Sequence, residues 1–413
     1  MEKGNRKIYY QLKHIDMKPT YLRQKALLTG ILLFSLAVFS CKHPIRKDLT
    51  VAIDRQFKDF FYADSNGISG ADGIFSIPLA DGSSVFLLGD CFLGKVENGT
   101  RDIDTKMLRN ALVLIDKNKT GAKPVYKGTY NDPVTFMEPV NEAGDLTYRW
   151  YWPGHGFVKS DTIYLFALSL YNVPSVVVKP ENTGEEKKEV DILLADMFGF
   201  RLSHIDLLSF TLPDFRHIET HKVDINYPVS QIDFGNCVMV DDGYVYIYGT
   251  KNFPGNAKIH VARVPLSSRT FYNNWEYSTG TGWDKNIEKS IPIDIDISVS
   301  EQFSIFKYKN KYILLTQERT GADIFTYVSD FPNKDFHNKK FIYHTTESES
   351  DTTKRIFTYN ALAHAQYIEN DRLLVSYCVN SFRARDFFEN VEAYRARFLR
   401  VPLRLILTKT DTK

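Results

Sequence analysis

A short strand-like phrase recurs five times along this chain of 413 residues. Each copy is a polar turn followed by a run of aromatic and β-branched residues, which is typical of a buried strand. The apolar runs start at Val85, Ile163, Val245, Ile313 and Leu374, with spacings of 78, 82, 68 and 61 residues. Recurrence of one strand–turn–strand unit indicates radial or stacked repeats. Because small sheets arranged in a ring protect one another's edges, five such units predict an all-β, five-bladed β-propeller.

The first 40 residues have the layout of an export signal. A basic stretch that ends at Lys25 precedes an apolar run over residues 26–39, which is too short to cross a bilayer as a helix. The run ends in Val-Phe-Ser-Cys, which resembles a bacterial lipobox and predicts lipidation of Cys41. A plain secreted protein and an uncleaved anchor are the alternatives, and Met17 is an alternative start to Met1.

These features divide the chain into four predicted segments. They are a lipoprotein signal peptide over residues 1–40, a tether over 41–56, the propeller over 57–405 and a C-terminal tail over 406–413. The lipid anchor would be the chain's one membrane contact. It would hold the propeller at the bacterial outer membrane or in the periplasm, with the cell surface included.

Charge, cysteine count and missing motifs narrow the function classes. After residue 40, 45 basic and 48 acidic residues remain, which argues against nucleic acid as a partner. Three cysteines remain, Cys91, Cys237 and Cys378, and their odd number predicts buried free thiols. The chain lacks a Gly-rich phosphate loop, a His-Glu-x-x-His helix and a Gly-x-Ser-x-Gly elbow. Nucleotide chemistry, zinc hydrolysis and serine esterase activity are therefore disfavoured.

Each predicted inner strand carries polar side chains near its start. In a propeller the innermost strands surround the central channel, so their starts meet at one mouth of that channel. The polar side chains at these five places are Asp72, then His155, then Asp233 and Asn236, then Glu301, and finally Tyr359 and His364. We expect these groups, which come from five different blades, to form one site.

Asp72 and Glu301 are the first candidates for catalysis. Glycoside hydrolysis needs two carboxyl groups on either side of a sugar ring, one as the acid and one as the base or nucleophile. Asp233 is a third candidate, because a nearby negative charge raises the pKa of a carboxylic acid. Taken singly, each of the three also fits a turn or strand-edge residue, and the shared position in the repeat is what favours catalysis.

Other polar residues are candidates for holding the substrate. Asp90 follows Gly89 at the end of a strand, where it would orient a sugar hydroxyl or Arg109, although a turn aspartate is an equal alternative. His155 would bind substrate or carry a proton, and Trp152 would stack on a sugar ring. His364 would contact sugar or ligate a cation, against the alternative that both histidines are structural. No cofactor is required, and a structural Ca²⁺ in the central channel is left open.

Several phrases of the sequence resemble a family of bacterial secreted propellers, domain of unknown function 4185 and its relatives. The matching phrases include Asp72–Leu79, Gly89–Gly94, Arg109-Asn110, Trp152–Gly154, Ser300–Ser304 and Tyr394–Phe398. The resemblance covers residues 60–403 and implies an arabinanase-like glycosidase. By position, it implies that Asp72 is the first-blade carboxylate and Glu301 the acid, with Arg109 and Asn110 beside the substrate.

The resulting expectation is a glycoside hydrolase that acts on an arabinan-like or related polysaccharide. Where the family has a modulating aspartate, the second blade of this chain offers His155, so only Asp233 or Asp90 is left for that role. A non-catalytic glycan-binding lipoprotein is the alternative, since many propellers serve only as platforms. A lyase or phosphoesterase is a third class, but the basic cluster or metal set that it needs does not stand out.

Overall fold

The computed structural model describes residues 49–140, 145, 147–173, 199–319 and 321–408, and within these residues the chain is all-β. The predicted signal peptide and Cys41 lie outside the described residues. No helix in the described ranges is both long and apolar enough to span a bilayer.

Five antiparallel sheets of four or five strands form the body of the structure. In chain order and from the first-mentioned strand outward they are β3 (Phe75–Pro78), β4 (Ser84–Leu88), β9 (Ala111–Ile115) and β10 (Ala122–Val125); β13 (Arg149–Lys159), β14 (Thr162–Asn172), β15 (Phe200–Thr211) and β16 (His217–Lys222); β17 (Ile232–Asp241), β18 (Tyr244–Phe253), β19 (Asn256–Pro265), β20 (Glu276–Ser278) and β21 (Trp283–Asp284); β22 (Ser304–Tyr308), β23 (Lys311–Gln317), β24 (Asp323–Ser329) and β25 (His337–His344); and β26 (Ile356–Glu369), β27 (Arg372–Ser381), β28 (Arg397–Pro402) and β1 (Ala52–Ile53).

Short elements fill the connections between these sheets. They are α2 (Arg55–Phe60), β2 (Ile68–Ala71), β5 (Cys91–Leu93), β6 (Val96–Glu97), β7 (Thr100–Arg101), β8 (Met107–Leu108), β11 (Lys127–Gly128), β12 (Pro133–Val134), α4 (Tyr227–Ser230), η2 (Ile287–Lys289), α5 (Glu347–Ser350), α6 (Asp386–Glu389), η3 (Val391–Tyr394) and α7 (Leu403–Ile406).

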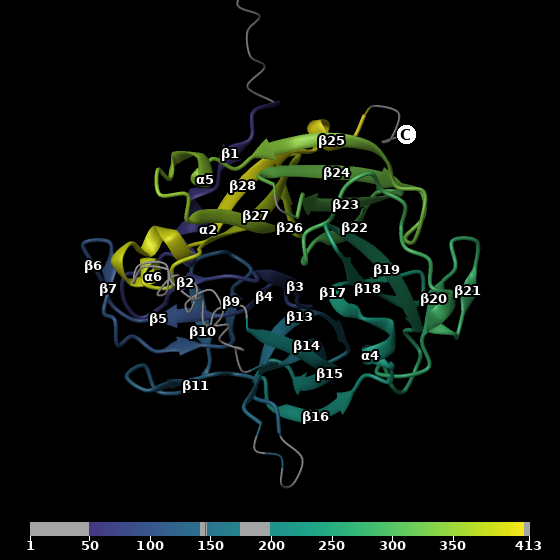
Figure 1. Cartoon of the computed structure of the whole chain (residues 1–413), viewed down its shortest axis with the longest axis horizontal. Helices are drawn as coiled ribbons and strands as arrows, with labels where there is room; N and C mark the ends of the chain where they lie inside the picture. The colour runs from purple at the N-terminus through teal and green to yellow at the C-terminus, as the bar shows by residue number, and fades with distance from the viewer. Residues whose placement is uncertain (1–48, 141–144, 146, 174–198, 320, 409–413) are drawn as a thin grey trace, which may run out of the picture. The chain divides into compact units, whose positions relative to one another are not determined.

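The first strands of the five sheets contact one another in a closed cycle. Strand β3 contacts β13, which contacts β17; β17 contacts β22, β22 contacts β26, and β26 returns to β3. Figure 1 shows the sheets following one another around a centre, from blue through teal and green to yellow. Aromatic and aliphatic side chains pack between neighbouring sheets, for example Phe166 of β14 against Phe234 of β17. Burial of such large apolar side chains is the main force that holds the sheets together.

The two ends of the described chain meet in the last sheet. Strand β1 pairs with β28, and Arg400 of β28 binds Asp54 at a distance of 2.5 Å. This moves both predicted boundaries: residues 52–56, assigned to the tether, belong to the fold, and Ile406 and Leu407, assigned to the tail, are buried. The sequence misled here because two-residue strands carry almost no period of their own.

Two histidines, half-buried His155 and buried His364, link the inner strands of neighbouring sheets. The ring of His155 on β13 bonds the carbonyl of Ser76 on β3 at 3.1 Å and accepts from the amide of Val238 on β17 at 2.9 Å. The ring of His364 on β26 lies between the hydroxyls of Ser76, at 2.7 Å, and Ser376, at 2.9 Å. Burial lowers the pKa of His155 to about 4 and that of His364 to about 3, so both rings are neutral at pH 7.

The remaining contacts of the cycle use a thiol and a hydroxyl. The amide of Ile305 on β22 donates to the Sγ of Cys237 on β17 at 3.1 Å. The amide of Ala363 on β26 donates to the hydroxyl of Ser304 on β22 at 2.9 Å. Every neighbouring pair of inner strands is thus joined through at least one side chain. Cys237, like Cys91 and Cys378, is buried and free, as the sequence predicted.

Three inner strands are interrupted at comparable positions. The pairing register skips from Pro153 to Gly156 in β13, from Phe234 to Cys237 in β17 and from Tyr359 to Leu362 in β26. Bulges of this kind turn the side chains on either side in new directions. Gly235 lies in the second bulge at φ +99°, where a Cβ would approach the Cβ of Phe166 to 2.6 Å. The bulges separate side chains that face the site from those that join the sheets.

Candidate functional site

Two aspartates of the first sheet form the first half of the site. Asp72 lies just before β3 and Asp90 just after β4. The backbone amide of Asp72 donates to the carbonyl of Asp90, and the amide of Gly89 donates to the carbonyl of Asp72. Gly89 is required here, because a Cβ at that position would lie 2.3 Å from the Oδ1 of Asp72. The hydroxyl of Tyr359 on β26 donates to the Oδ2 of Asp72 at 2.6 Å. The last sheet therefore fixes the orientation of a carboxyl group from the first.

The two carboxyl groups differ in how their charge is compensated. Arg109 binds Asp90 at 3.1 Å, and the indole of Trp152 on β13 donates to its other oxygen, also at 3.1 Å. Asp72 has no cationic partner among the described residues. Burial, and then the charge of Asp90, raise the pKa of Asp72 to about 7, against the hydrogen bond from Tyr359. Burial also raises the pKa of Asp90, but Arg109 and the hydrogen bond from Trp152 act against this rise, so we expect Asp72 to exchange a proton near neutral pH.

Asp233 and Glu301 form the second half of the site. Asp233 begins β17, and the hydroxyl of Tyr227 on α4 donates to its Oδ1 at 2.7 Å. Burial raises the pKa of Asp233 to about 7, and the charge of Glu301 adds to this effect. Glu301 lies just before β22 and forms an ion pair with Arg319, while Asn252 donates to its Oε2 at 3.4 Å. In this half too, one carboxylate is held by an arginine and its neighbour has a raised pKa.

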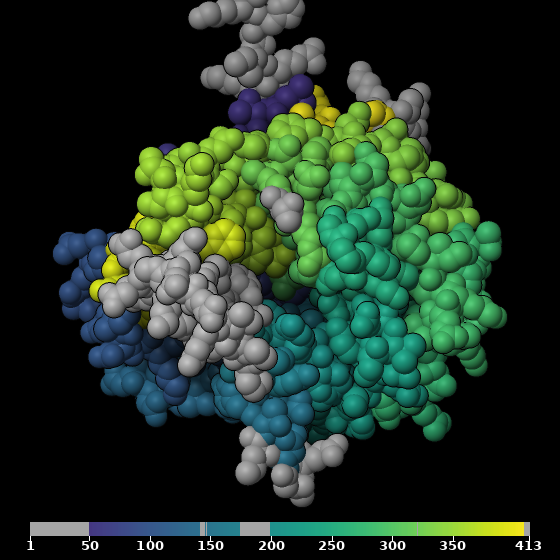
Figure 2. Space-filling view, in the orientation of Figure 1, coloured from purple at the N-terminus to yellow at the C-terminus, as the bar shows by residue number. Residues whose placement is uncertain are grey.

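Hydrogen bonds and close packing connect the two halves. Gln302 follows Glu301, and Gly73 follows Asp72. A Cβ built on Gly73 would lie 3.5 Å from the Nε2 atom of Gln302, so the two segments are in close contact. The Oδ1 of Asn360, next to Tyr359, accepts from the hydroxyl of Ser300 at 2.8 Å and from the amide of Gln302 at 3.2 Å. The Oε1 atom of Gln302 is buried without a hydrogen-bond partner among the described residues. Figure 2 shows a hollow near the centre of the face in view.

Several predicted site residues have their polar groups engaged in the fold. Asn110 is fully buried, and its amide clamps the backbones of Met137 and Tyr151 at 2.7 to 2.9 Å. Asn236 is buried and donates to Thr250 at 3.1 Å. His155 and His364 join the inner strands, as described above. These four remain predictions as ligands of a substrate, but the contacts that they make in this structure are structural.

The structure adds residues that the sequence did not single out. Tyr227, Arg319 and Gln302 reach the site only because a short helix and two loops bring them to the starts of the inner strands. No motif marked Tyr227 or Arg319, and Gln302 lies in a phrase quoted only for its resemblance. Tyr394, within a phrase quoted only for its resemblance, donates to the backbone of Asp90 at 3.1 Å.

A metal at this site has no support in the described residues. Within the described ranges, no three histidine, cysteine or acidic side chains are grouped closely enough to hold an ion. Both ring nitrogens of His364 are bonded to serine hydroxyls. His364 therefore offers no free nitrogen to a metal in this arrangement.

The fold and the site define an all-β protein whose sheets surround a set of paired carboxyl groups. Residues 54–403 match the family model described as domain of unknown function (DUF5005), and the chain belongs to this family. The matching family thus differs from the one expected from the motifs, domain of unknown function 4185. A comparison with curated protein sequences finds no match.

Solved structures resemble this chain in fold. A candidate hydrolase from Bacteroides ovatus aligns over 87% of this chain and 92% of its own, with a TM-score of 0.66 and 17% identity. A GH43_1 enzyme from Xanthomonas citri in complex with xylose aligns over 86% and 90%, with a TM-score of 0.45 and 11% identity. A GH32 β-fructofuranosidase from Bombyx mori aligns over 93% and 68%, with a TM-score of 0.45 and 10% identity. At such identities, a likeness concerns the fold alone.

Proposed function

We propose that this protein is a five-bladed β-propeller that hydrolyses glycosidic bonds at the starts of its inner strands. One observation carries the proposal: two carboxyl groups from different sheets, Asp72 and Asp233, both have a pKa raised to about 7. Carboxylic acids with raised pKa values beside ionised neighbours are the groups that acid–base glycosidases use. The fold shared with a candidate hydrolase agrees with this reading.

Asp233 is the better candidate for the acid. The sequence assigned that role to Glu301, but Glu301 forms an ion pair with Arg319, whereas Asp233 forms none among the described residues. Asp233 keeps its proton up to about pH 7 and bonds Tyr227 rather than a cation. In this mechanism Asp233 protonates the leaving oxygen. Glu301 supports the raised pKa through its charge.

Asp72 is the candidate for the base or nucleophile. Above pH 7 it is ionised and has no cation beside it among the described residues, so its lone pairs stay available for water or for the sugar carbon. Asp90, Arg109 and Trp152 form the adjoining surface, where they would bind sugar hydroxyls and the face of a ring. The motif resemblance favours an arabinan-like furanoside as the substrate.

Isosteric variants test this assignment. Asp72→Asn and Asp233→Asn should each lower kcat/KM on a responsive polysaccharide by about 10²–10⁴, because each removes one proton-transfer group. Glu301→Gln should lower it less. The measurement is sugar release from a panel of polysaccharides, with thermal unfolding as the folding control. Glycan binding without sugar release, unchanged in all three variants, would instead support a non-catalytic binding protein.

We also propose that the chain is exported and lipidated at Cys41, where a lipobox-like phrase follows an apolar run. In a bacterial host, the wild-type chain should incorporate labelled fatty acid and partition into detergent. The Cys41→Ser variant should do neither. Detergent partitioning of that variant at the wild-type level would contradict lipidation.

A further inference from the structure

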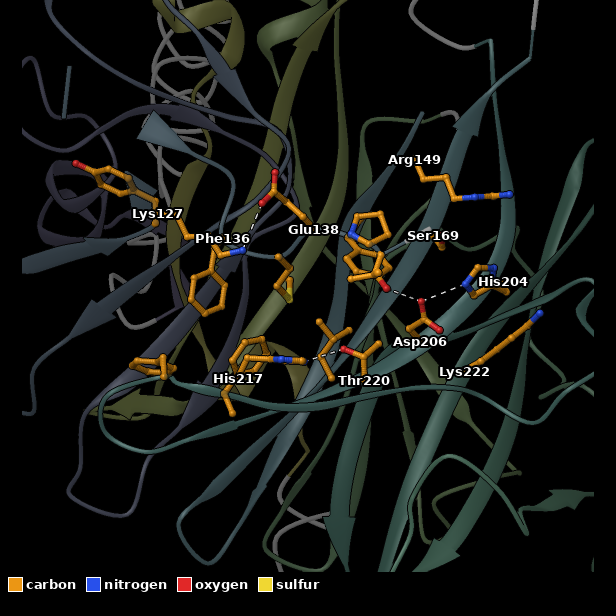
Figure 3. Close-up of a pocket in the computed structure, with 18 of the residues that line it drawn as sticks. Lys127, Phe136, Glu138, Arg149, Ser169, His204, Asp206, His217, Thr220 and Lys222 are labelled. Atoms are coloured by element: carbon orange, nitrogen blue, oxygen red, sulfur yellow. Dashed lines mark hydrogen bonds and ion pairs between the residues drawn. The ribbon is translucent and has the colours of Figure 1, made fainter. Parts of the chain in front are cut away.

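A cavity of about 830 Å³ lies on the second sheet, and none of the four carboxyl groups of the proposed catalytic site lines it. One wall is formed by β13, β14 and β15, and the other by the segment from Val125 to Val140, while β16 lies at its edge. Figure 3 shows Arg149, Ser169, His204 and Asp206 together on one side and Phe136 on the other. Its volume is within the range of small-molecule binding sites.

The strand register places the polar wall on one face of the sheet. Tyr151 of β13 pairs with Ser169 of β14, which pairs with His204 of β15. Arg149 and Asp206 lie two residues away from this row on β13 and β15, and therefore on the same face. Trp152, the residue after Tyr151 on β13, points to the opposite face of the sheet, where its indole donates to Asp90 of the proposed catalytic site. One strand thus contributes to two separate sites.

Three polar groups of this wall have unused hydrogen-bonding capacity. Asp206 is only 5% exposed, and Tyr151, at 2.5 Å, and His204, at 3.1 Å, both bond its Oδ2. No donor from the described residues reaches its Oδ1. The hydroxyl of Ser169, which is fully buried, and the Nη1 atom of Arg149 have no partner within the same residues. Leaving a buried polar group unpaired is unfavourable, so a bound ligand with matching groups would offset that cost.

The opposite wall is apolar and aromatic. Phe136 and Tyr126 line it, and the ring of Phe136 packs against that of Phe210 at the end of β15 with centroids 5.1 Å apart. A cavity with hydrogen-bonding groups on one side and aromatic rings on the other fits a molecule that is polar at its edges and apolar on its faces. A sugar ring has this property, because its hydroxyls lie at its edge and its C–H groups on its faces.

The charges at the cavity are largely balanced within the protein. Lys127 binds Glu138 at 3.3 Å, Arg149 binds Asp145 at 3.2 Å, and His204 binds Asp206 at 3.1 Å. Lys222, exposed at the edge on β16, also lines the cavity and forms no ion pair among the described residues, so only at the wall of Arg149 and Asp206 would a phosphate or carboxylate have to displace an acidic partner. A neutral ligand needs no such exchange.

We propose that this cavity is a non-catalytic binding site for a neutral saccharide of one or two rings. Asp206 and Ser169 would bind its hydroxyls from one side, and Phe136 would contact its face from the other. The site would hold a glycan chain on the protein independently of bond cleavage. That the glycan is also the substrate rests on the proposed function; the binding itself does not.

The test is calorimetric titration of the full chain carrying Asp72→Asn, which removes the proposed cleavage. The probes are neutral arabino-, xylo- and fructo-oligosaccharides, with oligogalacturonate and inorganic phosphate as anionic comparisons. Thr220→Trp should weaken binding of the best neutral probe at least tenfold, because exposed Thr220 lines the cavity and an indole would fill it. Asp206→Asn should weaken it by a similar factor.

Glu219→Trp is the matched control, since Glu219 is the exposed neighbour on β16 that does not line the cavity. It should bind within twofold of the parent. Equal affinities of Thr220→Trp and Glu219→Trp would overturn the proposal, as would tighter binding of the anionic probes. Absence of binding by any neutral probe at millimolar concentration would also overturn it. Failure of hydrolysis in the wild-type chain would instead count against the proposed function alone.

Discussion

At the scale of single residues, the site is a set of paired charges with unequal partners. Arg109 and Arg319 each hold one carboxylate, Asp90 and Glu301, and the neighbouring aspartate keeps a raised pKa. The two guanidinium groups thus separate the ion-paired carboxylates from Asp72 and Asp233, whose pKa values are raised mainly by burial. Sequence position alone could not assign these roles, since all four carboxyls precede, begin or follow a strand in similar ways.

Replacing Asp90 should change the proton affinity of Asp72. The Asp90→Asn variant removes the negative charge that helps to raise the pKa of Asp72, while its amide oxygen can still accept from Trp152. If Asp72 works as the base, the acidic limb of the pH profile of kcat/KM should move down by about one pH unit. Asp81→Asn, in an exposed turn, is the control and should leave the profile in place. An unmoved limb in Asp90→Asn would refute the coupling.

At the scale of elements, each bulged inner strand has two roles: one part presents side chains to the site, and another part bonds to the neighbouring sheet. Before the bulges they present Trp152, Asp233 and Tyr359 to the site, and within or after them they join neighbouring sheets through His155, Cys237 and Ala363. The recurring phrase was sufficient to predict the strands, whereas the shared role of Asp72, Asp233 and Glu301 stays a prediction. The phrase could not predict the bulges, because a two-residue skip in pairing is decided by the partner strand.

The junction of β1, α2 and β28 should be sensitive to Asp54. This residue caps α2 by accepting from the amide of Phe57 at 2.8 Å and forms the buried ion pair with Arg400. Asp54→Ala should lower the free energy of unfolding by about 1–3 kcal/mol, since it removes a helix cap and the nearer carboxylate partner of Arg400, which keeps Glu369 at 3.5 Å. Chemical denaturation measures the change. Glu97→Ala, which removes an exposed ion pair with Lys95, should cost less than about 1 kcal/mol.

At the scale of the whole molecule, the two inner-strand histidines and the site aspartates make opposite contributions to the pH dependence of stability. His155 and His364 have lowered pKa values, so the unfolded chain binds their protons more readily and stability falls as pH drops from about 6.5 to 4. Asp72 and Asp233 have raised pKa values, so the folded chain binds their protons more readily and stability rises as pH drops from about 7 to 4. In the wild-type chain the two contributions oppose each other.

The Asp72→Asn/Asp233→Asn double variant should remove the aspartate contribution to the pH dependence of stability and leave the histidine contribution. At pH 8 it should be more stable than the wild-type chain by about 1–3 kcal/mol, because no buried carboxylate has to ionise. Between pH 6.5 and 4 it should lose stability more steeply than the wild-type chain, since only the histidine contribution remains. Thermal unfolding across this pH range measures both. Parallel curves for the two proteins would show that the carboxyl pKa values are not raised in the folded state.

The sequence by itself determined the all-β class, the approximate strand positions and the buried free thiols, because hydrophobic period and turn residues are local properties. Tertiary structure decided which groups meet: Tyr359 with Asp72 across 287 positions, Ser76 with His364 across 288, and β1 with β28 at the ends of the fold. It also raised the pKa values of Asp72 and Asp233 through burial and formed the cavity on the second sheet. The physical reason is that burial and electrostatic interactions depend on distances in space, which spacing along the chain does not specify.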